Sequence, residues 1–366
     1  MQVAIVGLTA SGKTTVFNTL TRGHAQTGGF GGLTVNVGEV KVPDQRLTRL
    51  TDLFQPRREV PAAVTYVDLP APPSTDDGRA AADMPPDQLA RLRNADALLH
   101  VVRAFQDPTV AHPSGSVDSW RDLERLDLEF VLADLSVVEK RVEKLRTSGR
   151  HGTPAERESN ERELVVLERV QPALIAGTPV RDVDLSDDEA KLLRGFRLLT
   201  EKPILILLNV GESQLAQGAE LAAELTARYP HRHSRVAPLS ARIEMELGEL
   251  DDDEAEVFRQ DLGITESGLE RVIRASYELL GLISFFTAGA DETRAWTITE
   301  GATAVDAAGT IHSDLARGFI RAEVVGWEEL LTLRSFAEAR KQGQLRSEGK
   351  TYRVRDGDVI EVLFNV

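Results

Sequence analysis

The stretch Gly7-Leu8-Thr9-Ala10-Ser11-Gly12-Lys13-Thr14 decides the fold of this chain. It matches the phosphate-loop pattern, in which a glycine and any four residues precede Gly-Lys and then Ser or Thr. Residues 2–6 before it are apolar and β-branched, like a buried parallel strand, and residues 15–20 after it are typical of a helix. A strand, a glycine loop and a helix in this order predict an α/β domain that binds a nucleoside phosphate.

The residue types of this loop suit a phosphate because glycines let several backbone N–H groups point at one anion. The helix that begins near Lys13 adds the positive end of its dipole. We expect Lys13 to reach the β- and γ-phosphates and serve catalysis, and the Thr14 hydroxyl to ligate Mg²⁺. The alternative is a turn that binds nothing, and both spacing and context disfavour it. The residues of this segment expected to contact the nucleotide are Gly7, Ala10, Ser11, Gly12, Lys13, Thr14 and Thr15.

Length and composition limit the possible classes of protein. With 366 residues, of which 42% are hydrophobic, the chain should form two or three domains with proper cores. A net charge of −15 disfavours nucleic-acid binding over the whole surface, although a local basic face stays possible. The absence of cysteine excludes disulfides, cysteine-bound metals and thiol catalysis. No signal peptide or membrane-length apolar stretch is present, so we expect a cytoplasmic protein without membrane contact.

The order of apolar runs predicts the domain organisation. Runs at residues 3–6, 63–67, 97–102 and 204–209 are typical of strands in one α/β sheet. Helical spacing over 118–145 and 161–174, with a Gly- and Pro-containing turn between them, predicts an inserted helical hairpin. The predicted domains are a nucleotide-binding domain (1–117 and 201–282), an inserted helical domain (118–200) and a C-terminal domain (283–366).

The C-terminal domain shows a different pattern, with short β-type runs around one helix. The expected helix covers residues 302–311, and the expected strands cover 284–287, 294–299, 319–325, 352–354 and 359–364. Strands wrapped on a single helix in so short a segment predict a small α+β or β-grasp module.

A carboxylate follows the second predicted strand, in the segment Val67-Asp68-Leu69-Pro70-Ala71. A strand-end Asp68 commonly holds Mg²⁺ through water, and the N–H of Ala71 can bond the γ-phosphate; a helix-capping aspartate is the alternative. Related enzymes have glycine at the position of Ala71, and Pro72 has neither an N–H nor a side chain that orients water. Thr34 is a further candidate for the Mg²⁺ shell, with an ordinary loop hydroxyl as the alternative.

The base is expected to bind where the fourth strand ends, at Asn209-Val210-Gly211-Glu212. GTPases have Asn-Lys-x-Asp here, and the aspartate accepts hydrogen bonds from guanine. Val210 replaces that lysine, and the longer carboxylate of Glu212 cannot keep the aspartate's geometry, so guanine selection should weaken. Ser240-Ala241, after another apolar strand, is expected to close over the base.

Together and in this order, these segments resemble the YchF-type Obg-like ATPases over essentially the whole chain. The most specific segments are residues 36–38, 209–212, 239–244, 286–289, 294–298, 318–324 and 356–359. The resemblance implies a Ras-like P-loop nucleotide domain, an inserted α-helical coiled-coil hairpin and a C-terminal β-grasp domain of the TGS type. It also implies hydrolysis of ATP in preference to GTP, and association with ribosomes.

Further expectations depend on this resemblance. The family has a histidine suspected of helping catalysis in the loop after the third strand, and His112-Pro113-Ser114-Gly115 matches that segment, with a surface-loop histidine as the alternative. Ala10 stands where the family has an asparagine that helps coordinate K⁺, so K⁺ dependence stays open. A basic cluster at the hairpin tip is a candidate contact to ribosomal RNA, or a solvated helix end: Lys140, Arg141, Lys144, Arg146 and Arg150.

We therefore expect a Mg²⁺-dependent protein that slowly hydrolyses ATP to ADP and phosphate, as a ribosome-associated translation or stress switch. It is expected to be a monomer in isolation. Lys13, Thr14 and Asp68 favour an enzyme, whereas Ala71 and Pro72 favour a scaffold that binds nucleotide without hydrolysing it. A GTPase is the remaining alternative.

Overall fold

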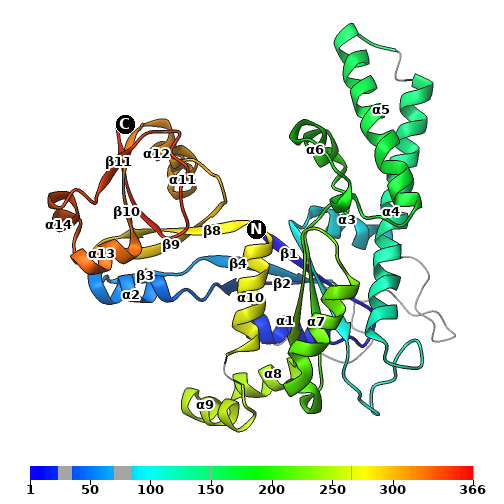
Figure 1. The fold of residues 1–366 in the computed structure, drawn as a ribbon, viewed down its shortest axis with the longest axis horizontal. Helices are drawn as coiled ribbons and strands as arrows, with labels where there is room; N and C mark the ends of the chain where they lie inside the picture. Colours follow the sequence, from blue (N-terminus) through cyan, green and yellow to red (C-terminus); the bar gives the residue numbers. More distant parts are fainter. Residues whose placement is uncertain (24–34, 70–83, 149–150, 265, 366) are drawn as a thin grey trace. The chain divides into compact units, whose positions relative to one another are not determined.

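The computed structural model describes residues 1–23, 35–69, 84–148, 151–264 and 266–365 (Figure 1). Four residues discussed above lie outside the described residues, namely Thr34, Ala71, Pro72 and Arg150. The chain forms two compact units, residues 1–38 with 65–272 and residues 39–64 with 273–366. This division differs from the three domains expected from the sequence, because residues 39–64 group with the C-terminal part. One reason is that β3 (Arg58–Val60) pairs with β9 (Glu292–Thr299).

The first sheet has six strands in the order β2-β4-β1-β5-β6-β7, with parallel pairing from β4 to β7. Every residue of β5 and β6 is buried, as expected for central parallel strands covered on both faces. Because these strands are parallel, their carboxyl ends lie at one edge, where α/β sheets bind ligands. The strands are β1 (Gln2–Val6), β2 (Asn36–Lys41), β4 (Ala63–Asp68), β5 (Ala97–Arg103), β6 (Ile204–Asn209) and β7 (Ser234–Leu239).

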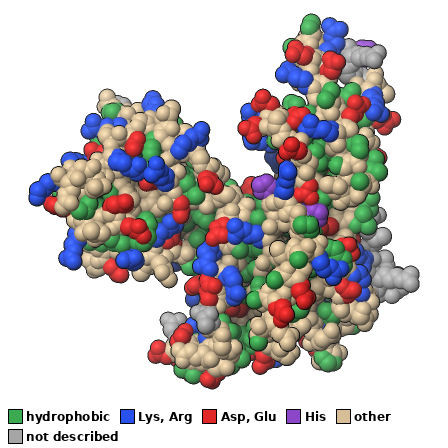
Figure 2. All heavy atoms as spheres, in the orientation of Figure 1, with side chains coloured by type: hydrophobic (Ala, Val, Ile, Leu, Met, Phe, Trp, Pro, Cys, Tyr) green, Lys and Arg blue, Asp and Glu red, His purple; other side chains and the backbone are tan. Residues whose placement is uncertain are grey.

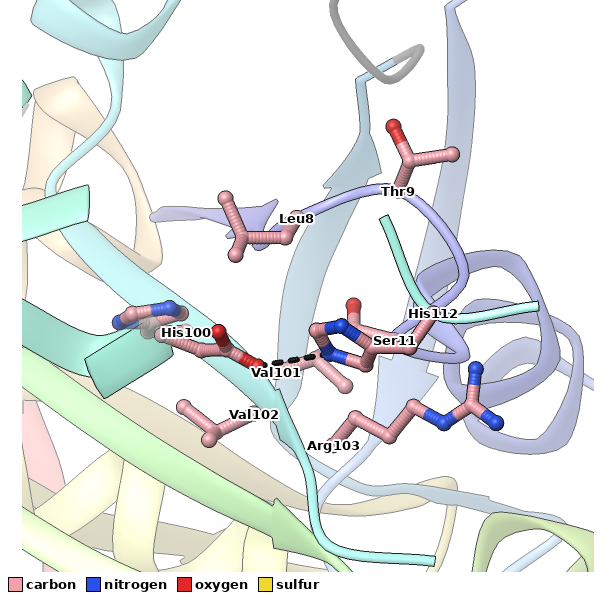
Figure 3. Close-up of a pocket in the computed structure, with 9 residues that line it drawn as sticks. Leu8, Thr9, Ser11, His100, Val101, Val102, Arg103 and His112 are labelled. Carbon is pink, nitrogen blue, oxygen red and sulfur yellow. Dashed lines mark hydrogen bonds and ion pairs between the residues drawn. The ribbon is translucent and has the colours of Figure 1, made fainter. Parts of the chain in front are cut away.

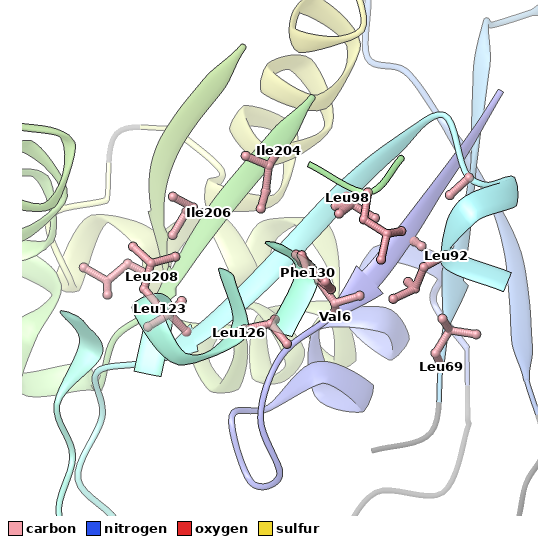
Figure 4. Close-up of a cluster of buried hydrophobic side chains, with 14 of the residues drawn as sticks. Val6, Leu69, Leu92, Leu98, Leu123, Leu126, Phe130, Ile204, Ile206 and Leu208 are labelled. Atoms are coloured by element: carbon pink, nitrogen blue, oxygen red, sulfur yellow. The ribbon is translucent and has the colours of Figure 1, made fainter. Parts of the chain in front are cut away.

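Helices cover this sheet and complete its core. Leu123, Leu126 and Phe130 of α4 (Ser119–Ser148) pack in one buried cluster with residues of β5 and β6 (Figure 4). Burying each such side chain contributes about 1.5–3 kcal/mol, so the first turns of α4 are firmly fixed to the sheet. The other helical segments of the first unit are α1 (Lys13–Thr21), α3 (Pro86–Asn94), η3 (Glu212–Gln217), α7 (Gly218–Arg228), α8 (Ala241–Glu249) and α9 (Asp252–Asp261). Helix α10 (Gly268–Leu279) begins in the first unit and ends in the second.

The predicted helical hairpin is present, formed by α4 and α5 (Pro154–Ile175) (Figure 1). Thr153 and Glu156 form a capping box that begins α5. The hairpin has its own buried core, which includes Val138, Val142, Leu167, Val170 and Leu174. Two residues of the predicted basic cluster pair across the hairpin, Arg141 with Glu163 and Arg146 with Glu168. The short segments η1 (Val180–Asp182), α6 (Asp187–Leu193) and η2 (Arg194–Phe196) follow.

The second unit contains a mixed six-stranded sheet in the order β11-β10-β12-β8-β9-β3. Its core packs α11 (Ala304–Ile311) against the sheet, which is the β-grasp arrangement predicted from the sequence. The prediction of a strand at 352–354 is wrong, because only Arg353 forms an isolated bridge, to Thr303. The remaining elements are α2 (Gln45–Phe54), β8 (Leu282–Ala288), β10 (Phe319–Gly326), β11 (Arg346–Glu348), β12 (Asp358–Phe364), α12 (Ser313–Arg317), α13 (Trp327–Leu333) and α14 (Phe336–Lys341). No helix in the described part of the chain is long and apolar enough to cross a membrane.

Candidate nucleotide-binding site

The phosphate loop connects β1 to α1, and its backbone needs glycine at two positions. Gly7 and Gly12 have φ angles of 149° and 95°, which L-amino acids rarely adopt. A β-carbon would lie 2.4 Å from the Val101 carbonyl oxygen at Gly7, and 2.3 Å from the Asn209 amide nitrogen at Gly12. Ala10 also has a left-handed φ of 63°, which costs a residue with a β-carbon about 1–2 kcal/mol. The loop therefore has a specific shape, strained at Ala10, and lies close to Val101 of β5 and Asn209 of β6.

Lys13 lies in the first turn of α1, and its amine bonds back to the loop. Its Nζ donates to the carbonyl oxygens of Gly7 at 2.9 Å and Leu8 at 2.8 Å. Burial lowers the pKa of Lys13 to about 8, and the nearby Asp68 carboxylate only partly opposes this effect. The amine of Lys13 is therefore a cation whose charge is poorly compensated, at the place where a phosphate would bind.

The predicted Mg²⁺ ligands Thr14 and Asp68 lie together. Asp68 Oδ2 accepts hydrogen bonds from Thr14 Oγ1 at 3.1 Å and Asn36 Nδ2 at 3.4 Å. Asp68 Oδ1 is buried with no partner among the described residues, and burial raises the pKa of this carboxyl. Among the described residues, no group of three or more His, Asp or Glu side chains is arranged to hold a metal ion. One carboxylate and one hydroxyl suit Mg²⁺, which keeps waters and takes phosphate oxygens as its other ligands.

Asn209, at the end of β6, connects the phosphate loop to the predicted base loop. Its Nδ2 donates to the Ser11 carbonyl oxygen at 3.0 Å, and its Oδ1 accepts from the Ala241 N–H at 3.1 Å. Asn209 and Ser240 are both buried, at 4% exposure. The structure thus brings together Asn209, Ala241 and the phosphate loop, which lie far apart in the sequence.

The two replaced residues of the base segment have very different surroundings. Val210 is 3% exposed and packs in the core, so its side chain offers no face to a base. Glu212 is exposed at the start of η3. Of these two residues, only Glu212 has a side chain that can select between bases.

His112 lies beside the phosphate loop, close to Ser11 and Arg103 (Figure 3). Its Nε2 is 2.8 Å from Asp122 Oδ2, and its Nδ1 accepts from the Ser114 N–H at 3.1 Å. The space lined by these residues has no room for a water molecule. His112 therefore reaches the neighbourhood of the site but contacts Asp122 there.

Three further residues lie around this loop that no sequence motif indicated: His100, Arg103 and Asp122. Arg103 donates to the Ala10 carbonyl oxygen at 3.4 Å and to the Val110 carbonyl oxygen at 2.9 Å, so it links the phosphate loop to the segment before His112. Burial lowers the pKa of His100 to about 3, with Lys13 adding to the effect, so its ring is neutral. Arg103 is the last residue of β5. This strand-end position, like that of Asp68, is the feature of the sequence that could have indicated a residue near the site.

This geometry defines a Ras-like P-loop nucleotide-binding protein. A family model described as "50S ribosome-binding GTPase" matches residues 2–146, and the YchF-GTPase_C model, "Protein of unknown function (DUF933)", matches residues 282–365. The "Ribosome-binding ATPase YchF" of Bacillus subtilis is 40% identical over 371 residues and covers 100% of both chains. The chain belongs to the YchF family.

Two further relatives agree with this assignment. The "Ribosome-binding ATPase YchF" of Escherichia coli O157:H7 is 38% identical and covers 99% of this chain and 98% of its own. The solved structure of the Schizosaccharomyces pombe YchF GTPase has a TM-score of 0.86 at 28% identity and covers 99% of this chain and 97% of that one. The predicted fold, with its nucleotide domain, helical hairpin and β-grasp domain, is confirmed by this likeness.

Proposed function

We propose that this protein hydrolyses ATP to ADP and phosphate with Mg²⁺, slowly and in preference to GTP, as a cytoplasmic switch at the ribosome. The observation that supports this most directly is the group formed by Lys13, Thr14 and Asp68 beside a phosphate loop. The relatives named ribosome-binding ATPases match this chain from end to end, which supports ATP as substrate and the ribosome as partner. The proposed oligomeric state in isolation is a monomer.

Each residue has a separate task in this proposal. The loop N–H groups and the Lys13 amine bind the phosphates and stabilise the charge that develops on them during transfer to water. Thr14 and, through water, Asp68 hold Mg²⁺, which would neutralise charge on the phosphate oxygens. Asn209 holds the two loops in register around the nucleotide. Thr34 and Ala71 are proposed to add a hydroxyl to the Mg²⁺ shell and an N–H to the γ-phosphate, respectively.

The preference for ATP depends on the base segment. Glu212 is longer than the aspartate that GTPases use, and Val210 is buried instead of stacking on the base as the GTPase lysine does. Both features weaken guanine recognition. Ser240 and Ala241 are proposed to line the base on its other side.

His112 is the proposed catalytic histidine, which would orient the attacking water or donate to the γ-phosphate. The candidate alternative to an ATPase is a scaffold that binds nucleotide without hydrolysis. The replacement of the usual glycine by Ala71, followed by Pro72, favours this alternative.

The test is to titrate ATP and GTP against the purified protein with Mg²⁺, and then to follow phosphate release from the tighter ligand. An ATPase binds ATP more tightly and releases phosphate at a rate far below the roughly 10 s⁻¹ of stimulated GTPases. Tight ATP binding without release supports the scaffold, and tighter GTP binding contradicts the base assignment. Co-sedimentation with purified ribosomes, with and without ATP, tests the partner.

A further inference from the structure

The contact between His112 and Asp122 has a consequence for how hydrolysis is controlled. Because the Ser114 N–H donates to Nδ1, Nδ1 is an acceptor, so Nε2 carries the hydrogen and donates to Asp122 Oδ2. Both ring nitrogens are therefore occupied. The His112 and Asp122 side chains are only 5% and 4% exposed. In this position the imidazole has no nitrogen left for a water molecule or a phosphate.

Asp122 is itself held in place from its other side. Its Oδ1 accepts from Arg121 Nε at 3.0 Å and Nη2 at 2.9 Å, and the same guanidinium donates to the Ser116 carbonyl oxygen at 2.7 Å. Its neighbour Leu123 is fully buried against the sheet. The carboxylate is thus a fixed point, whereas His112 belongs to the loop between β5 and α4.

We propose that Asp122 is an autoinhibitory positioning residue that holds His112 away from the γ-phosphate until the loop is displaced. This inference rests on the proposed catalytic role of His112. Hydrolysis at the basal rate then proceeds only in the small fraction of molecules in which the contact is broken. A hydrogen bond to a charged group favours the state in which His112 contacts Asp122 by a factor on the order of 10 to 100.

The arrangement also indicates how His112 is released from Asp122. Arg103 connects the Ala10 carbonyl oxygen to that of Val110, so a shift of the phosphate loop is transmitted to the segment that precedes His112. Arg121 connects the end of the same segment, at Ser116, to the first turn of α4, whose other end forms the helical hairpin. A partner that displaces this segment from α4 would break the contact and speed hydrolysis.

The experiment compares the unsubstituted 366-residue protein with Asp122→Ala, Asp122→Asn, His112→Ala and the double variant Asp122→Ala/His112→Ala. We expect Asp122→Ala to raise the basal kcat for ATP about tenfold with little change in KM, and Asp122→Asn to raise it less. In the double variant the gain disappears and kcat equals that of His112→Ala, because the two residues act through one contact. Asp134→Asn is the matched control, since it alters another buried aspartate of α4 that bonds the Leu199 and Thr200 N–H groups instead.

A second measurement does not depend on activity. Nitrogen-resolved NMR of the imidazole should find His112 as the neutral ring with hydrogen on Nε2, and Asp122→Ala should abolish this fixed form. The inference is overturned if this form is absent in the unsubstituted protein, or if Asp122→Ala lowers kcat or leaves it unchanged while His112→Ala lowers it. If His112→Ala leaves kcat unchanged, the catalytic role proposed for the histidine fails instead, whatever NMR finds at the contact.

Discussion

The phosphate side and the base side of the site are built differently. On the phosphate side, the functional groups of Lys13, Thr14 and Asp68 converge on one place, and each has capacity left for a ligand. On the base side, the Asn209 amide donates to the Ser11 carbonyl oxygen and accepts from the Ala241 N–H. Val210 lies in the core. Substitutions on the phosphate side should therefore change the rate of ATP hydrolysis. On the base side, some substitutions should lower the stability of the fold and others should change the preference between ATP and GTP.

The largest expected effect is that of Lys13→Met. It removes the cation proposed to stabilise charge on the transferred phosphoryl group, so kcat/KM for ATP should fall roughly 10²–10³-fold. The fold should remain, because the buried amine of Lys13 carries a poorly compensated charge. Single-turnover phosphate release and the unfolding midpoint measure the two effects, with the exposed Lys191→Met as control. A loss below tenfold would mean that backbone N–H groups alone perform the phosphate chemistry.

Asn209→Ala should show the structural character of the base side. It leaves the Ser11 carbonyl and the Ala241 N–H without their buried partner, which costs about 2–4 kcal/mol of unfolding free energy. ATP and GTP affinities should fall together, with their ratio unchanged. Denaturant unfolding and nucleotide titrations measure these quantities, and Asn94→Ala, whose exposed amide bonds Arg197, is the control. A change in the ratio itself would show that Asn209 reads the base directly.

The same contrast explains what the sequence could predict. The alternation of strands and helices predicts that the phosphate loop and the strand-end Asp68 lie at one edge of the sheet, and Thr14 Oγ1 is 3.1 Å from Asp68 Oδ2. The orientation of side chains was not predictable. His112 turns to Asp122 ten residues later, and Val210 faces the core, because packing against distant strands decides both. The grouping of residues 39–64 with the C-terminal part likewise depends on the pairing of β3 with β9, which no local pattern indicates.

Glu212→Asp should change the selectivity between ATP and GTP without changing stability. The shorter carboxylate restores the length that GTPases use, so the ratio of GTP affinity to ATP affinity should rise about tenfold. This is the size of effect expected for one added polar contact. Stability should be unaffected, because Glu212 is exposed. Titrations with ATP, ADP, GTP and GDP measure the ratios, and Glu220→Asp on the exposed face of α7 is the control. An unchanged ratio would exclude Glu212 from base recognition.

The smallest expected effect is a proton taken up with the nucleotide. Burial holds the pKa of Lys13 near 8, below its usual value of 10.5. Between pH 8 and pH 10.5 the unfolded chain therefore binds more protons at this residue than the folded protein does. Because of this difference, Lys13 makes the stability of the fold rise with pH in that range. The folded protein without ligand favours the neutral amine, whereas a bound phosphate favours the charged amine. ATP binding at pH 8.5 should therefore take up roughly half to one proton, and the affinity for ATP should weaken toward pH 10. Calorimetric titrations in two buffers of different ionisation enthalpy measure this uptake, and Lys13→Met should abolish it. Uptake that persists in Lys13→Met would assign the proton to another group and would remove Lys13 as the cation that the phosphate side offers to its ligand.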